Sequence, residues 1–122
     1  MPKKILVVDD EQTIQILLKA VLEKEGYSVI VAGSGQECLK KLETTKPDLV
    51  ILDMMMPSMT GRETLLKIKK NPKTKNLKII FLTVVHASQV GKEELKKNGV
   101  LEYITKPFNN AELVKKIKQI IN

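Results

Sequence analysis

The chain has 122 residues, which is the length of one ordinary domain and too short for two well-packed ones. Hydrophobic residues make up 43%, enough for a normal core, yet no run approaches the roughly 20 apolar residues that a membrane span needs. No secretory signal is recognisable, and the single cysteine, Cys38, excludes an internal disulfide, so we expect a soluble cytoplasmic domain with Cys38 buried.

The net charge of +7 comes from lysines, because Arg62 is the only arginine. The lysines are spread along the chain, and aromatic residues make up only 3%. Proteins that read nucleic acids favour arginine forks and stacking aromatics. We therefore interpret the charge as a solvated surface and expect no direct nucleic-acid binding.

Five short apolar runs alternate with amphipathic helical patterns along the chain. The runs occupy residues 5–8, 29–31, 49–52, 78–83 and 101–105. Helical spacing of apolar residues follows each run, and it is weakest over residues 88–97. We expect Met54, Met56 and Leu101 to finish the core around the strands, and His86 to be a solvated loop residue.

The expected helices carry recognisable start and stop signals. Gly26 is placed to end the first helix in a left-handed conformation. Capping boxes are predicted from Ser34 with Glu37 and from Thr60 with Glu63. Asn109 is expected to cap the last helix in a similar way.

Strands that are apolar along their whole length, separated by helices, indicate a parallel sheet covered on both faces. Five such units predict an α/β fold, the flavodoxin-like doubly wound (βα)5 three-layer sandwich with strand order 2-1-3-4-5. A barrel of eight units would need about twice this length. We expect one domain over residues 1–122 with no attached output domain.

Polar residues follow four of the five runs, and in a parallel sheet these positions meet at one edge. They are Asp9, Asp10 and Glu11 after the first run, Asp53 after the third, Thr83 at the end of the fourth, and Lys106 with Pro107 after the fifth. Crowded carboxylates need a cation between them, and an all-oxygen site suits Mg²⁺. A carboxylate beside such a metal can attack a phosphoryl group, which the lysine and the hydroxyl would contact.

These residues resemble the receiver domain of two-component response regulators, in its single-domain, chemotaxis-regulator-like form. The resemblance covers the whole chain. It rests on four motifs: Asp9-Asp10, the segment Asp53-Met-Met-Met-Pro57 with Gly61, Thr83, and Lys106-Pro107-Phe108. Their separations agree with the five predicted β/α units.

The resemblance implies that Asp53 accepts a phosphoryl group from a sensor histidine kinase or a phosphotransfer protein. It implies Mg²⁺ ligation by Asp10, Asp53 and the backbone carbonyl of Met55, with Asp9 acting mainly through water. Lys106 would contact the phosphoryl group, and the Lys106-Pro107 peptide bond would be cis.

The resemblance also implies a switch. Thr83 would move towards the phosphoryl oxygens, Tyr103 would turn inwards, and the face made by the fourth helix, fifth strand and fifth helix would change. The output would be contact with a downstream protein target. The domain would not be an enzyme, although it would assist its own phosphorylation and dephosphorylation, and we expect a monomer or weak dimer.

Val84 departs from the family pattern, in which the residue after the switch threonine is usually small. Met55 and Val85, two residues beyond Asp53 and Thr83, are both apolar. These positions influence the attack of water on the phosphorylated aspartate in this family. We therefore predict slow self-dephosphorylation.

The same residues allow alternative interpretations. Asp9 and Asp10 alone could be a turn that caps a helix, and Tyr103 alone could be half-buried packing. A receiver-like interaction module that acts without phosphorylation is the main alternative. A flavodoxin-type cofactor binder lacks the phosphate loop after the first strand, and an aspartyl-phosphate hydrolase lacks a substrate-binding cap.

Overall fold

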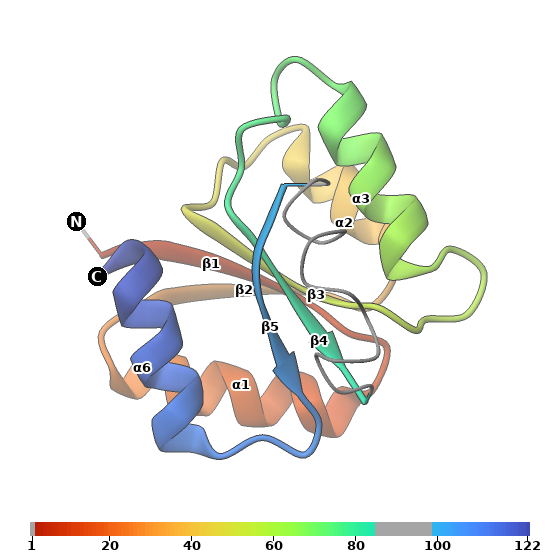
Figure 1. Cartoon of the computed structure of the whole chain (residues 1–122). Helices are drawn as coiled ribbons and strands as arrows, with labels where there is room; N and C mark the ends of the chain where they lie inside the picture. Colours follow the sequence, from red (N-terminus) through yellow and green to blue (C-terminus); the bar gives the residue numbers. More distant parts are fainter. Residues whose placement is uncertain (1, 85–98) are drawn as a thin grey trace.

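Five parallel strands form the central sheet, in the order β2-β1-β3-β4-β5 (Figure 1). Their bounds are Lys4–Val8 for β1, Ser28–Ala32 for β2, Leu49–Asp53 for β3, Ile79–Thr83 for β4 and Val100–Thr105 for β5. The computed structural model describes residues 2–84 and 99–122. The predicted fold class and strand order are confirmed.

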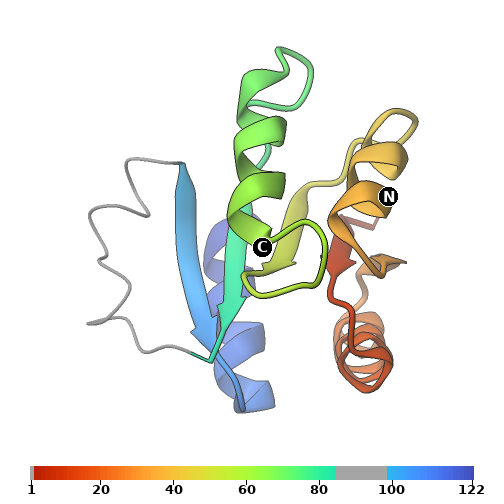
Figure 2. The ribbon, with the colours of Figure 1, turned by 90° about the vertical axis from the view of Figure 1, so that its right-hand side faces the viewer.

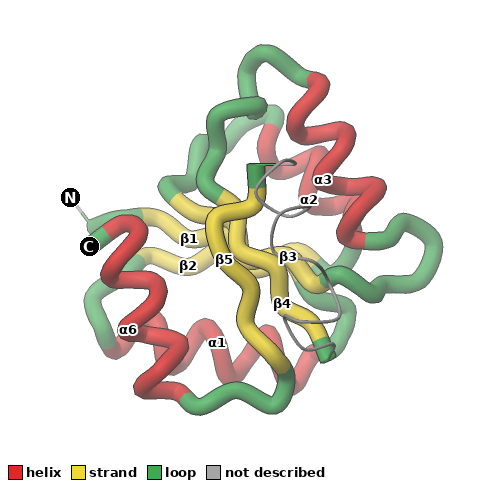
Figure 3. The backbone as a smooth tube through the Cα atoms, viewed as in Figure 1, coloured by secondary structure: helices red, strands yellow, loops and turns green. Residues whose placement is uncertain are grey.

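Within the described residues, two helices cover each face of the sheet. They are α1 (Gln12–Lys24), α2 (Gly35–Leu42), α3 (Gly61–Lys70) and α6 (Asn110–Ile121). Helices α1 and α6 lie on one side of the strands, and α2 and α3 lie on the other (Figure 2, Figure 3). None of the helices in the described ranges is long and apolar enough to cross a membrane. The helix predicted over residues 88–97 lies outside the described residues, as do Val85 and His86.

The central strands β1, β3 and β4 are buried on both faces, which explains their continuous apolar character. In β1, Ile5 and Val7 pack under α1 and α6, whereas Leu6 and Val8 pack under α2 and α3. All four are fully buried. Because successive side chains of a strand point to opposite faces, each strand contributes to two separate cores.

Helix ends agree with the predicted signals at three positions and differ at one. Thr60 and Glu63 form a complete capping box, and Gly26 has a φ of +93° just beyond α1. The Asn109 side chain accepts a hydrogen bond from the backbone N–H of Glu112. The predicted box at the start of α2 is only half present.

The difference at α2 lies in the partner of Glu37. The Ser34 hydroxyl accepts a hydrogen bond from the backbone N–H of Glu37, as expected for a cap. The Glu37 carboxylate, however, accepts from the N–H of Gly33 and not from that of Ser34. It also lies 3.8 Å from the Lys41 ammonium one turn along the helix. The reciprocal half of the box is therefore displaced by one residue.

Most predictions about core residues are confirmed. Met54 and Met56 are each 6% exposed, and Cys38 is fully buried. Burial raises the pKa of the Cys38 thiol to about 12. The prediction for Leu101 is wrong, because its side chain is 50% exposed on the edge strand β5 while its neighbour Val100 takes the core position.

Candidate functional site

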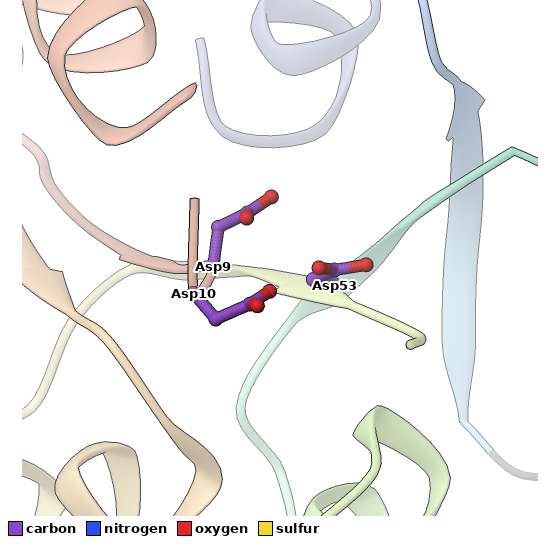
Figure 4. Close-up of side chains that lie close together, drawn as sticks. All are labelled: Asp9, Asp10 and Asp53. Carbon is purple, nitrogen blue, oxygen red and sulfur yellow. The ribbon is translucent and has the colours of Figure 1, made fainter. Parts of the chain in front are cut away.

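Strand pairing brings the predicted acidic residues together. Strands β1 and β3 are neighbours, with Val8 opposite Leu52. Asp9 and Asp53 follow these two positions, so they lie side by side at the carboxyl edge of the sheet. Both are buried, although they carry charge. Figure 4 shows Asp10, from the same turn as Asp9, directed towards the same space.

Asp9, Asp10 and Asp53 each place one carboxylate oxygen within 4.8 Å of the others. Asp10 is exposed to solvent, whereas the other two are buried. The donor set is made only of oxygen atoms and is open on one side. This arrangement fits a hard divalent cation that keeps several waters.

Asp9 is held in place by its own loop. Its Oδ1 atom accepts a hydrogen bond of 2.9 Å from the Glu11 N–H, and its N–H donates to the carbonyl of Ala32. The Gln15 amide donates to the backbone carbonyl of Asp9 at 2.6 Å. The buried Oδ2 atom has no hydrogen bond of good geometry among the described residues. That oxygen is paired instead with the Lys106 ammonium, 2.9 Å away.

Lys106 supplies the positive charge of the site. Its Nζ lies 2.9 Å from Asp9 Oδ2, 3.4 Å from Glu11 Oε1 and 3.5 Å from Asp53 Oδ2. Burial alone would lower the pKa of Lys106, but the surrounding carboxylates, Asp9 above all, raise it. The Lys106–Pro107 peptide bond is cis, as the resemblance implied. The Lys106 N–H donates to the Thr83 carbonyl at 2.6 Å, which ties this loop to the end of β4.

Asp53 ends β3 in a protected position. Its side chain accepts a 3.1 Å hydrogen bond from the Met55 N–H and is reached by Lys106. Burial is the main cause that raises the pKa of Asp53 to about 6, and the charge of Asp9 adds to it. The Met55 N–H and Lys106 act in the opposite direction. A carboxylate with this environment is poorly solvated without a further cation.

Gly61 allows the loop after β3 to close over Asp53. A Cβ atom at Gly61 would lie 2.2 Å from the Asp53 carbonyl oxygen and 2.7 Å from the Met54 Cα atom. The Gly61 N–H donates to the Met54 carbonyl at 3.0 Å. The absence of a side chain here therefore brings the start of α3 against the backbone of the acidic residue.

Thr83 and Tyr103 lie on neighbouring strands and on the same side of the sheet. Thr83 pairs with Thr105, and Phe81 pairs with Tyr103. Tyr103 therefore lies on β5 two residues before the residue that pairs with Thr83. Thr83 is 1% exposed. Tyr103 is partly buried against the core under α2 and α3, and the Lys116 ammonium lies 5.8 Å from its ring centre.

Residues 5–118 match the family model described as the response regulator receiver domain. The chain belongs to this family. Phosphorylation on an aspartate is general for such receiver domains of two-component systems. Among curated relatives, the alkaline phosphatase synthesis transcriptional regulatory protein PhoP of Bacillus subtilis is 40% identical over 121 residues, which is 99% of this chain and 49% of PhoP. The chain thus spans about half the length of such relatives.

Solved receiver structures share the fold. The chemotaxis protein CheY4 of Vibrio cholerae has a TM-score of 0.90 and 32% identity, with 98% of this chain and 99% of CheY4 covered. The response regulator TrrA of Thermotoga maritima, in complex with Mg²⁺ and BeF, has a TM-score of 0.82 and 43% identity. That alignment covers 97% of this chain and 98% of TrrA.

Two residues near the site in the sequence, Met55 after Asp53 and Val84 after Thr83, have exposed apolar side chains. Met55 is 67% exposed and Val84 is 65% exposed. Val85, the third residue predicted to tune the rate of phosphate loss, lies outside the described residues. The effect of all three on the chemistry stays a prediction.

Glu11, which the sequence placed at this edge of the sheet without a role, contacts Lys106. Gln15 holds the Asp9 backbone and was not predicted as part of the site. Gln15 gave no signal in the sequence, because a polar residue on a helix is ordinary.

Proposed function

We propose that this receiver domain takes a phosphoryl group on Asp53 from a sensor histidine kinase or a phosphotransfer protein. The supporting observation is the position of Asp53, which is buried between two other carboxylates and a lysine at the carboxyl edge of the sheet. The proposal assigns Asp53 as the nucleophile: its oxygen forms a bond to phosphorus while the bond from phosphorus to the donor nitrogen or oxygen breaks.

The donor set fits Mg²⁺. Asp10 and Asp53 would be direct ligands, joined by the Met55 carbonyl, and Asp9 would act mainly through water. When bound, Mg²⁺ would neutralise the carboxylates and the charge of the incoming phosphoryl group. The supporting observation is the set of three carboxylates whose oxygen atoms lie within 4.8 Å of one another.

Lys106 would supply a positive charge to the phosphoryl oxygens, and Thr83 a hydrogen bond. The Lys106 ammonium is already 3.5 Å from Asp53 Oδ2, and its backbone is bonded to Thr83. The resulting movement of Thr83 would make room for Tyr103, which lies on the same side of the sheet. The altered surface would include β5 and α6 and would contact a downstream protein target.

This assignment makes the domain a switch that assists its own phosphorylation and dephosphorylation, and not an enzyme acting on a separate substrate. The cytoplasmic location and the monomeric or weakly dimeric state stay predictions from the sequence.

Incubation with acetyl phosphate and Mg²⁺, followed by intact mass measurement, tests the proposal. We expect the mass of one phosphoryl group, absent in Asp53→Asn and after chelation of the metal. If neither acetyl phosphate nor a phosphorylated histidine kinase modifies the protein, the alternative of an interaction module acting without phosphorylation is favoured.

A further inference from the structure

A groove runs between the end of α2 and the loop that joins α3 to β4. Its volume is about 450 Å³, within the range of roughly 300–1,000 Å³ that is usual for ligand sites. A second hollow of about 190 Å³ continues it, and the two share Leu42, Glu43, Lys73 and Thr74. We call the combined feature the α2–α3 groove. It lies where the strands begin, at the opposite edge of the sheet from Asp53.

The groove combines an apolar floor with a lysine rim. The apolar floor is made by Leu39, Leu42 and Leu77, which are partly or almost fully buried. The lysine rim is made by Lys46, Lys67 and Lys73, which are all exposed. This pattern resembles the anatomy of a docking site, with an apolar centre and a charged border.

The charge around the groove is mostly positive, with Glu43 as the acidic residue in its described lining. Residues 64–84 include six lysines and no aspartate or glutamate. Two of these lysines have structural roles: Lys69 donates to the carbonyls of Lys75 and Leu77, and Lys78 donates to that of Ile120. The members of the lysine rim form no ion pair within the described parts of the chain, 2–84 and 99–122.

The helix dipole explains only part of this pattern. Lys67 lies in the last turn of α3, where a positive charge is favourable. Lys46, however, lies in the loop after α2 and faces the same groove from the other side. Lysines from two separate segments therefore converge on one apolar floor. The helix dipole accounts for the position of Lys67 but not for that of Lys46.

We propose that the α2–α3 groove binds an acidic, amphipathic peptide segment of a partner protein. Apolar side chains of the segment would cover the apolar floor, and its carboxylates would meet the lysine rim. A second copy of this chain is a poor occupant, because each copy carries a net charge of +7. This inference does not depend on the phosphorylation of Asp53.

Nucleic acid fits the groove less well than a peptide. No aromatic or arginine side chain is among the lining residues of the described structure, so bases have nothing to stack on. Glu43 lies between the apolar floor and the lysine rim and would repel a continuous phosphate backbone. A peptide can place a backbone amide or a hydroxyl beside this carboxylate instead.

Amide NMR shifts, followed during titration with a short peptide of alternating glutamate pairs and leucine pairs, test the proposal. We expect saturable shifts around the groove. The double variant Lys67→Glu/Lys73→Glu should weaken binding by roughly tenfold or more at low salt, because two attractive charges become repulsive. A peptide with serine in place of leucine should bind far more weakly.

The matched control is Lys19→Glu/Lys24→Glu on α1, which changes the net charge equally on the other side of the sheet. It should leave the affinity nearly unchanged, and thermal melting should show that both double variants are folded. The proposal is overturned if binding is not saturable, if both double variants weaken it equally, or if a single-stranded DNA oligonucleotide binds the same residues more tightly than the peptide.

Discussion

The ammonium of Lys106 lies 2.9 Å from Asp9 Oδ2, closer than to the Asp53 carboxylate that it is expected to serve. One lysine therefore offsets the charge of several carboxylates, and it lies beside the oxygen atoms that would hold a metal. We propose that a divalent cation at this site would compete with the Lys106–Asp9 contact. Lys106 would then turn to the phosphoryl group when the cation takes its place beside Asp9.

This competition predicts that Lys106→Met strengthens Mg²⁺ binding while it slows phosphorylation. Two charges about 4 Å apart interact by about 4 kcal/mol at an effective dielectric constant of 20, and a tenfold change in affinity needs only about 1.4 kcal/mol. We expect roughly tenfold tighter Mg²⁺ binding by calorimetry. Lys116→Met removes the same charge beside Tyr103 and is the control. Unchanged or weaker Mg²⁺ binding in Lys106→Met would contradict the competition.

The raised pKa of Asp53 predicts that its charge destabilises the metal-free fold. The pKa is raised from 3.8 to about 6, so the folded state keeps the proton more tightly than the unfolded state. Stability falls as the pH rises from about 4 to about 6, and the loss amounts to about 3 kcal/mol above that range. Asp53→Asn lacks this loss and should be the more stable protein at pH 7 without metal.

Urea unfolding of the wild type and Asp53→Asn between pH 4 and pH 8 measures this difference. The gap in unfolding free energy should be small at pH 4, should widen up to pH 6, and should narrow when Mg²⁺ is added to the wild type. A gap that is constant over the whole pH range would rule out a raised pKa at Asp53.

The sequence predicted the fold because the central strands β1, β3 and β4 are buried on both faces. Continuous apolar runs as short as residues 49–52, each followed by a helical pattern, are typical of buried parallel strands. The parallel arrangement places residues after different strands at one edge, so Asp9 and Asp53 were predictable as neighbours from the sequence alone. Thr60 and Gly26 were predictable because caps depend on local chemistry.

The errors lie where tertiary contacts decide between similar local choices. Glu37 bonds to Gly33 and not to Ser34, a shift of one residue that no spacing rule distinguishes. Leu101 is exposed because β5 is an edge strand whose register shifts near its start. The contact between Glu11 and Lys106 joins residues far apart in the chain, and only their positions in the folded structure reveal it.

Gly61→Ala should disturb the site by a steric effect on the Asp53 backbone. The new Cβ would lie 2.2 Å from the Asp53 carbonyl oxygen, so the chain has to shift. We expect a loss of roughly 1–3 kcal/mol in unfolding free energy and a slower reaction with acetyl phosphate. Gly33→Ala is the control, since its Cβ would meet its nearest atoms at an ordinary 3.5 Å. Equal effects of the two substitutions would show that the close approach at Gly61 is unimportant.

The exposed apolar residues near Asp53 predict a long-lived phosphorylated state. Val84 is 65% exposed and follows Thr83 directly, and we expect its side chain to hinder the approach of water to the phosphoryl group. Val84→Ala should open this approach and speed phosphate loss a few-fold, which corresponds to less than about 1.4 kcal/mol in the barrier. Val85→Glu should speed it further, because a carboxylate can orient the attacking water.

The rate of phosphate loss after removal of acetyl phosphate, followed by intact mass, measures this effect. Leu66→Ala is a suitable control, because Leu66 is 53% exposed on α3 and has no place in the acidic site. Its phosphate lifetime should equal that of the wild type. If Val84→Ala and Val85→Glu also leave the lifetime unaltered, water reaches the phosphorylated Asp53 by a route that these side chains do not control.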